Sequence, residues 1–311
     1  MELKPIHELD FETYLNNLGL QQVTISKHLL YFKHFKEMFG GFITQKTLDS
    51  FLQQKTSPNH KAMIKHLIDL LKRDSLLTQE EQLEVNRFVI LKRLGRKGGK
   101  PIEIFTKEEL KRLLDNCKFG SSFNKERFKL MVLWQYSAGL RVDELCRLKW
   151  EHLNYQGRTK FFEQGRDKLK YQKILLPPEL TKGEKGAYVY IMTEAYLGYF
   201  TFLDHWKGIN ESVVNRIYNN LRPIWVRNKN KYSKEFKQQC LTTLGLQGKT
   251  THILRHSRAT HLFQEGLTLL QVRDFMRHSS VVTTEKYLHL AQDMVSKGLE
   301  ELDTISDKNA P

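Results

Sequence analysis

The C-terminal half of the chain contains a tyrosine preceded by two arginines, two histidines and a lysine that together could act on a phosphodiester. In chain order these residues are Arg141, Lys168, His252, Arg255, His278 and Tyr287. Attack of a phenolate on phosphorus needs cations for the phosphate oxygens, an acid for the leaving oxygen, and a nucleophile. The set therefore indicates cleavage and rejoining of DNA through a phosphotyrosine.

Three of the basic residues in the segment 252–256 have helical spacing. Arg255 and His256 follow His252 by three and four residues, so the three side chains share one face if the segment is helical. Burial of such a face costs several kcal/mol unless an anion compensates the charge. A scissile phosphate would be that anion, and this face is a candidate phosphate site.

Two stretches of the chain carry a family signature. Residues 137–153 read SAGLRVDELCRLKWEHL, and residues 252–290 read HILRHSRATHLFQEGLTLLQVRDFMRHSSVVTTEKYLHL. Both stretches resemble the signature boxes of the tyrosine recombinase (phage integrase) family. The second box matches from its HxLRH core to its TT and YxH end, and the resemblance covers about residues 104–291.

The resemblance implies a role for each matching residue. It makes Tyr287 the nucleophile of an in-line attack that leaves a 3′-phosphotyrosine. The groups that it implies on the phosphate oxygens are Arg141, His252, Arg255 and His278. Because the phosphotyrosine keeps the energy of the broken bond, we expect no metal, no ATP and no other cofactor.

Three further residues have supporting roles in this interpretation. Glu144 follows Arg141 by one helical turn, on the same face, and is expected to hold a catalytic arginine or histidine in place. His256 and His261 are expected to be core or supporting histidines.

The lysine departs most from the family pattern. The family places it in the turn of a small hairpin, where this chain reads EQGRDKLKYQKILLPP and Arg166 stands at the usual lysine position. We assign the role to Lys168, with Lys170 as the alternative. The expected role is protonation of the departing 5′ oxygen.

Composition favours a polyanionic partner and an intracellular location. The chain has 311 residues, a formal net charge of +15 and a sequence pI of about 9.5, which favours double-stranded DNA. Its three cysteines are far apart and show no metal-ligand spacing, so neither a disulfide framework nor a zinc site is expected. With no signal-peptide pattern and no membrane span in the sequence, we expect a cytoplasmic, nucleoid-associated protein.

We predict a mainly α fold with a small antiparallel β-sheet. A helical N-terminal core-binding domain (residues 1–91) and a mixed α/β catalytic domain (residues 104–311) are expected to form a DNA clamp. Gly40-Gly41 should end one helix of the first domain, and Pro58 should begin another. The linker 92–103 is basic and glycine-rich, and its cations lie on a solvated loop or along a DNA backbone. These cations are Lys92, Arg93, Arg96, Lys97 and Lys100.

Within the catalytic domain, local signals place several elements. Thr106 and Glu109 form the pattern of a capping box at a helix start. Phe161-Phe162 and the segment 174–176 are typical of short strands, and the chain beyond Pro177-Pro178 is expected to return to helix. The polar stretch 180–248 is longer than the family pattern requires, and it is either an insertion loop or an added DNA contact.

The tail from about residue 290 has apolar residues at helical spacing. It either packs on its own domain or, as the resemblance implies, docks into a neighbouring protomer and couples the active sites of a homotetramer on DNA. The sequence leaves open whether Tyr287 acts within its own protomer or in a neighbour.

The residues favour a site-specific DNA recombinase or integrase over two alternatives. A type IB topoisomerase-like nicking and closing enzyme shares the same catalytic residue types but acts as a monomer. A DNA-binding relative without activity is the other alternative, which the unusual lysine position keeps open. Neither the target sequence nor the choice between integration, excision and dimer resolution can be inferred from these residues, because phosphate contacts do not specify bases.

Overall fold

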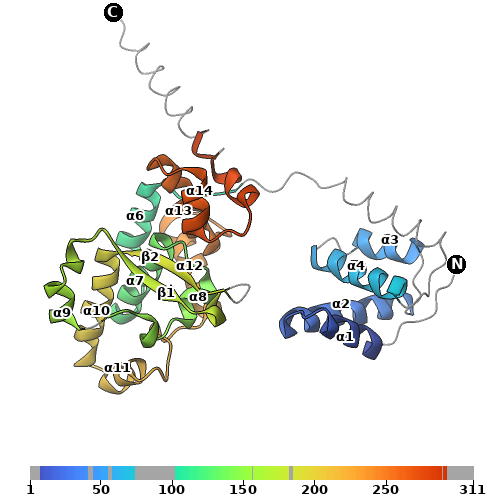
Figure 1. Cartoon of the computed structure of the whole chain (residues 1–311), viewed down its shortest axis with the longest axis horizontal. Coiled ribbons are helices and arrows are strands. Elements are labelled where there is room, and N and C mark those ends of the chain that lie inside the picture. Colours follow the sequence, from blue (N-terminus) through green and yellow to red (C-terminus); the bar gives the residue numbers. More distant parts are fainter. Residues whose placement is uncertain are drawn as a thin grey trace, which may run out of the picture. The chain divides into compact units, whose positions relative to one another are not determined.

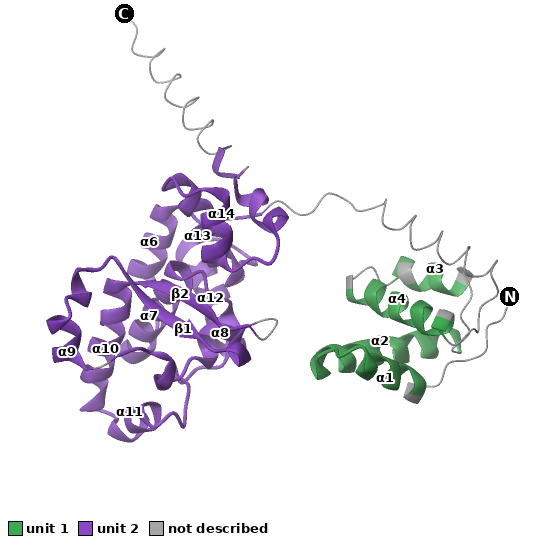
Figure 2. Ribbon diagram, in the orientation of Figure 1, with its two compact units in different colours: residues 1–100 green, residues 101–311 purple. Residues whose placement is uncertain are grey.

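The computed structural model describes residues 8–40, 45–54, 58–73, 102–155, 157–181, 185–288 and 290–292. These residues belong to two compact units, Met1–Lys100 and Pro101–Pro311 (Figure 2). Most of the tail from about residue 290 lies outside the described residues. So do the predicted DNA-binding cations Lys92, Arg93, Arg96, Lys97 and Lys100.

The described part of the first unit is a group of helices (Figure 1), and their buried apolar residues form one core. Its described helices are α1 (Glu8–Asn17), α2 (Gln22–Phe39), α3 (Gln45–Gln54) and α4 (Pro58–Arg73). Phe11 and Phe32 are fully buried, with ring centroids 5.0 Å apart. The predicted end of α2 is confirmed, because Gly40 adopts φ 65° and its N–H donates to the Lys36 carbonyl. The predicted start of α4 at Pro58 is also confirmed.

We predict that the first unit loses stability in mild acid, because its core contains two histidines. The rings of His28 and His66 lie 5.2 Å apart, and neither Nδ1 atom has a hydrogen-bond partner in the structure. Burial lowers the pKa of both imidazoles. The unfolded chain therefore binds more protons than the folded one, and stability falls as the pH drops below about 6.5, the ordinary histidine value.

Hydrogen exchange measures this effect on the intact protein. We expect protection of the α2 and α4 amides, corrected for intrinsic exchange rates, to decrease between about pH 7.5 and about pH 5.5. The decrease should be smaller in His28→Leu, which removes one of the two titrating groups. Protection that does not change over this interval would contradict the prediction.

The second unit contains the remaining described helices and a two-stranded sheet (Figure 1). Its longer helices are α6 (Lys107–Asn116), α7 (Ser122–Ser137), α10 (Thr193–Lys207), α11 (Glu211–Tyr218), α12 (Lys229–Leu244), α13 (His252–Gln264) and α14 (Leu269–Met276). The shorter ones are α8 (Val142–Arg147) and α9 (Arg158–Glu163), and residues 281–288 are also helical. The predicted capping box at the start of α6 is present, with Thr106 and Glu109 bonding each other's backbone N–H. In the described parts of the chain, no helix has the length and apolar character needed to cross a membrane.

The sheet confirms part of the strand prediction and corrects the rest. Strands β1 (Tyr171–Leu176) and β2 (Ala187–Met192) pair antiparallel, with Ile174 opposite Val189. The prediction of helix after Pro177-Pro178 was wrong over β2, whose residues 188–191 alternate between exposed and buried. Phe161-Phe162 was wrongly predicted as strand. Both residues lie on α9, which buries Phe161 against the ring of Tyr196 at 6.1 Å.

The polar stretch 180–248 forms part of the hydrophobic core of this unit. Trp134 of α7 packs against Tyr199 of α10 and against Trp225, with ring centroids 5.5 and 5.2 Å away. The Trp134 Nε1–H donates to the Ala195 carbonyl, and the Tyr199 hydroxyl donates to the Ile224 carbonyl. An insertion loop is therefore the wrong description of this stretch, because its aromatic side chains build the core.

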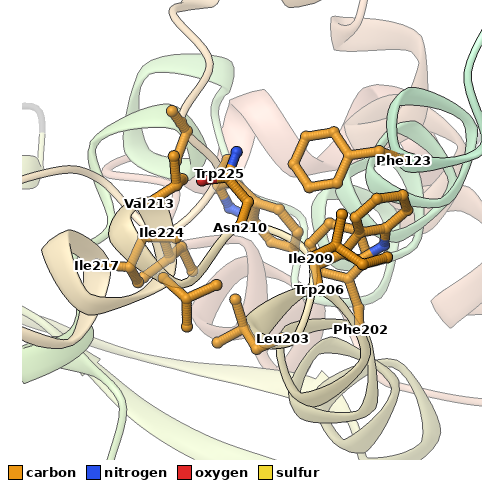
Figure 3. Close-up of a pocket in the computed structure, with 12 residues that line it drawn as sticks. Phe123, Phe202, Leu203, Trp206, Ile209, Asn210, Val213, Ile217, Ile224 and Trp225 are labelled. Atoms are coloured by element: carbon orange, nitrogen blue, oxygen red, sulfur yellow. The ribbon is translucent and has the colours of Figure 1, made fainter.

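An apolar pocket of about 250 Å³ opens beside this core (Figure 3). Its lining includes Phe123, Leu203, Trp206, Val213 and Ile217 (Figure 3). The lining contains no acid, base or cation. Phosphate chemistry therefore requires a different part of the unit.

Candidate active site

The turn between α7 and α8 brings Arg141 and Glu144 together. Arg141 precedes α8, where its backbone N–H donates to Glu144 Oε2 at 2.8 Å and its Nη1 donates to Glu144 Oε1 at 2.7 Å. The Glu144 side chain is only 2% exposed, whereas that of Arg141 is 31% exposed. The carboxylate is thus buried, while the guanidinium remains accessible to an anion.

Glycine is required in this turn for α14 to pack against it. Gly139 has φ 56°, and a Cβ at this position would lie 2.8 Å from the Met276 Sδ. The backbone conformation and the close approach both exclude a larger residue. Gly139 thus sets the distance between Arg141 and the end of α14.

Arg255 on α13 links this turn to the end of α14. The residue is 5% exposed, and its two terminal nitrogens donate to the backbone carbonyls of Gly139 and Met276. A planar guanidinium can make both bonds at once in a fixed orientation. Residues 252–256 are helical, as part of α13, so the condition for His252, Arg255 and His256 to share one face is met.

Tyr287 contacts two histidines, one through its hydroxyl and one through its ring. His256 Nδ1 is 2.8 Å from the hydroxyl oxygen. The ring of His278 stacks on that of Tyr287 at 5.8 Å, and its Nδ1 lies 2.9 Å from the Thr284 hydroxyl. The His252 ring is 6.3 Å from the His256 ring. His256 was expected only in the core or in support, and the structure instead places it in direct contact with the tyrosine.

Burial and the arginine charges keep these histidines neutral. Burial lowers the pKa of His278 to about 4, helped by Arg255 and Arg141. Burial, with His252 and Arg255, lowers the pKa of His256 to about 4 as well. A neutral imidazole has one nitrogen that can accept a hydrogen bond, so His256 accepts from the Tyr287 hydroxyl in the tautomer that leaves Nδ1 unprotonated.

The electrostatic environment also affects the tyrosine and His252. Burial raises the pKa of Tyr287, and the nearby charge of Arg255 opposes this rise. Burial, together with Arg255 and Arg141, lowers the pKa of His252. Tyr287 is therefore a protonated phenol in the free protein, and it needs a base and a nearby anion-stabilising charge to become a nucleophile.

Arg277 is a residue of this site that we did not predict from the sequence. Its Nη2 donates to Glu144 Oε2 at 2.8 Å, and its side chain is 10% exposed. Burial raises the pKa of the Glu144 carboxyl, but Arg277 and Arg141 outweigh it and the net pKa is lowered. The available sequence signal was a basic residue directly before His278.

Removing the charge of Glu144 is expected to destabilise the second unit. Glu144→Gln keeps the shape but leaves the buried Arg277 without its anionic partner, which should lower the free energy of unfolding by about 3 kcal/mol. Urea denaturation measures the change. Glu151→Gln is the matched control, because Glu151 is 51% exposed and its ion pair with Lys149 spans 3.8 Å. That control should cost less than about 1 kcal/mol, and equal losses in the two variants would contradict the prediction.

The predicted lysine does not contact the other predicted catalytic residues in the structure. Lys168 is the last residue of a short 3-10 helix (Arg166–Lys168) that precedes β1. Both Lys168 and Lys170 are exposed. Lys170 lies over the Tyr171 ring, 5.7 Å from its centroid. Among the contacts of the described residues, none joins either lysine to Arg141, Arg255 or Tyr287. In the same residues, no group of three or more histidine, cysteine, aspartate or glutamate side chains is placed to hold a metal ion.

Comparison with known proteins places the chain in a family. Residues 103–294 match the phage integrase family. Tyrosine recombinase XerA of Thermococcus kodakarensis is 27% identical over 301 residues, which cover 95% of each chain. Tyrosine recombinase XerC of Bacillus pumilus is 26% identical over 229 residues, which cover 71% of this chain and 68% of the relative.

Solved structures of recombinases share the fold. XerH bound to palindromic difH, in a post-cleavage complex, superposes with a TM-score of 0.61 at 18% identity, covering 96% of this chain and 85% of XerH. A lambda integrase dimer bound to a COC′ core site gives 0.60 at 17% identity, covering 92% and 95%. The predicted mainly α fold with a small antiparallel sheet is confirmed.

Because the family match spans more than half of the chain, the protein belongs to the phage integrase family. It is accordingly an enzyme, a site-specific DNA recombinase.

Proposed function

We propose that this recombinase cuts one DNA strand by in-line attack of the Tyr287 oxygen on a phosphodiester. The tyrosine oxygen–phosphorus bond forms as the bond from phosphorus to the 5′ oxygen breaks, leaving a 3′-phosphotyrosine and a 5′-hydroxyl. A 5′-hydroxyl from another strand then reverses the step. The observation that carries this proposal is the position of the Tyr287 hydroxyl, 2.8 Å from His256 and beside the charge of Arg255.

Two proton transfers accompany this step, one from the phenol and one to the departing 5′ oxygen. We assign the phenol proton to His256 Nδ1, which lies 2.8 Å from the hydroxyl oxygen. Because burial lowers the pKa of His256 to about 4 in the free protein, this transfer requires the bound phosphate anion, whose negative charge raises that pKa. The departing 5′ oxygen takes a proton from Lys168, or from Lys170 as the alternative. Both lysines are exposed on the segment that leads into β1, so DNA binding must bring one of them to the leaving oxygen.

The phosphate charge is held by residues that three helices contribute. Arg141 lies at the start of α8, His252 and Arg255 lie on α13, and His278 follows α14. We assign these groups to the non-bridging oxygens, where they stabilise the charge that builds up in the transition state. A guanidinium can bind two such oxygens at once, which suits Arg141 because it is the accessible arginine of the site.

Double-stranded DNA is the proposed partner. We propose that the first unit and the catalytic unit together form a clamp around it. Residues 1–91 would bind the duplex, and the linker cations of residues 92–103 would follow its phosphate backbone. A solved lambda integrase structure, with a TM-score of 0.59, is a tetramer bound to a Holliday junction. By analogy we propose a homotetramer on DNA, assembled through the tail from about residue 290, that acts on DNA in the nucleoid.

Covalent trapping tests this function and separates it from a topoisomerase-like activity. The protein and its Tyr287→Phe variant are incubated with sheared genomic DNA of the source organism and quenched with detergent, and the ends of the protein-linked fragments are sequenced. Adducts that share one sequence and are absent from the variant support the recombinase and reveal its target. Scattered ends would favour nicking and closing, and DNA binding without any adduct would contradict the proposed cleavage.

A further inference from the structure

Arg277 has a backbone conformation that normally favours glycine. It follows α14 with φ 55° and ψ 45°, in the left-handed region that residues with a Cβ rarely adopt. The N–H groups of Arg277 and His278 donate to carbonyls of the last turn of α14, the pattern that a glycine after a helix usually makes. Arginine is less stable than glycine in this backbone conformation. The Arg277 side chain, however, makes contacts that a glycine could not make.

The side chain of Arg277 is buried among the groups of the active site. Besides the 2.8 Å bond from its Nη2 to Glu144 Oε2, its terminal nitrogens lie 3.3 and 3.4 Å from the carbonyl oxygens of Ala138 and Gly139. Its Nε is buried and has no hydrogen-bond partner in the structure. The guanidinium therefore ties the residue before His278 to the turn that carries Arg141.

Arg277 shares the Glu144 carboxylate with Arg141. Oε1 accepts from the Arg141 side chain, whereas Oε2 accepts from the Arg141 backbone and from Arg277. Within the described part of the chain, Arg141 makes no other side-chain hydrogen bond. A guanidinium has five donors, so this single contact orients Arg141 and leaves its other donors to a phosphate.

We propose that Arg277 is a positioning residue for DNA strand cleavage, which holds Glu144 so that Arg141 keeps a single contact with it and presents its remaining donors to the scissile phosphate. This inference rests on the proposed function, because it concerns the same phosphate. Without Arg277, Glu144 would face Arg141 alone and could take two of its donors. The site would also lose one of the two positive charges that now contact the single negative charge of Glu144.

The test compares Arg277→Gly and Arg277→Lys with the wild type. Glycine suits the left-handed backbone and preserves the turn, whereas lysine keeps the charge without the fork. Arg273→Ala is the matched control, because Arg273 lies in the last turn of α14, just before Arg277, and its side chain pairs, among the described residues, only with that of Asp274. The substrate is a duplex of the sequence recovered by covalent trapping, made with a natural scissile phosphate or with a methylphosphonate that lacks one charged oxygen.

We expect Arg277→Gly to form the covalent adduct about 100-fold more slowly than the wild type on the natural phosphate. Arg277→Lys should recover part of this rate, and Arg273→Ala should match the wild type. On the methylphosphonate, which places less demand on the orientation of Arg141, the difference between Arg277→Gly and the wild type should narrow.

Two results would overturn the inference. One is an Arg277→Gly protein that cleaves as fast as the wild type. The other is an equal defect on both substrates together with a lowered melting temperature, because a purely structural role does not depend on the charge of the phosphate. A wild-type protein that forms no adduct would instead contradict the proposed function, so the two failures are distinguishable.

Discussion

The Tyr287→Phe protein is expected to form no covalent adduct with DNA while remaining folded and able to bind DNA. The substitution removes a single oxygen, the proposed nucleophile, and phenylalanine keeps the ring that stacks on His278. Strand cleavage should fall by about a millionfold, a typical loss when a covalent nucleophile is removed. Loss of the hydrogen bond to His256 should lower the free energy of unfolding by only about 1 kcal/mol.

Gel shift of the same duplex, with and without detergent, measures binding and adduct separately. Tyr188→Phe is the matched control, because Tyr188 lies on β2 and is 52% exposed. It should cleave at the wild-type rate. An adduct that persists in Tyr287→Phe would show that a different residue attacks the phosphate.

Substituting lysine for Arg255 is expected to be the second most damaging change. Lysine keeps one positive charge but cannot bond the Gly139 and Met276 carbonyls together, because it lacks the planar fork that fixes the position of the charge. We expect cleavage to fall by about 100- to 1,000-fold, comparable to the loss of one preorganised donor to a developing charge.

Single-turnover cleavage at saturating protein isolates this chemical step from DNA binding. Arg216→Lys is the matched control, since Arg216 is exposed on α11, and it should leave the rate unchanged. A wild-type rate in Arg255→Lys would mean that a positive charge alone is enough at this position. That result would remove the role assigned to the guanidinium fork.

Local spacing in the sequence was sufficient to predict the residues that share one helix. His252, Arg255 and His256 lie on α13 as their spacing predicts, because helical periodicity is a local property. The capping box at Thr106 and the end of α2 at Gly40 were predictable for the same reason.

Contacts between distant elements were beyond such local rules. Arg277 reaches Glu144 across 133 residues, from a left-handed conformation that nothing in the motif demands of an arginine. The contact between His256 and Tyr287 likewise depends on how the helix of residues 281–288 packs against α13. Arg277 was therefore missed, and His256 was expected only as a core or supporting histidine.

Secondary structure between the two signature stretches was predicted less well, for two physical reasons. The strand β2 buries Val189 and Ile191 and exposes Tyr188 and Tyr190, a period-two pattern that its aromatic content obscured. The buried side chains of the stretch 180–248, among them Trp225 and Tyr232, are separated along the chain by exposed polar residues, so the stretch appeared polar as a whole. A pair such as Phe161-Phe162 is too short to distinguish helix from strand.

Identification of the amino acid bound to DNA is the most direct test of the proposed mechanism. The trapped adduct would be digested with nuclease and protease, and the nucleotide-bearing peptide sequenced by mass spectrometry. The predicted result is a nucleotide joined through its 3′-phosphate to Tyr287. A nucleotide on any other residue, or one joined through its 5′-phosphate, would contradict the mechanism.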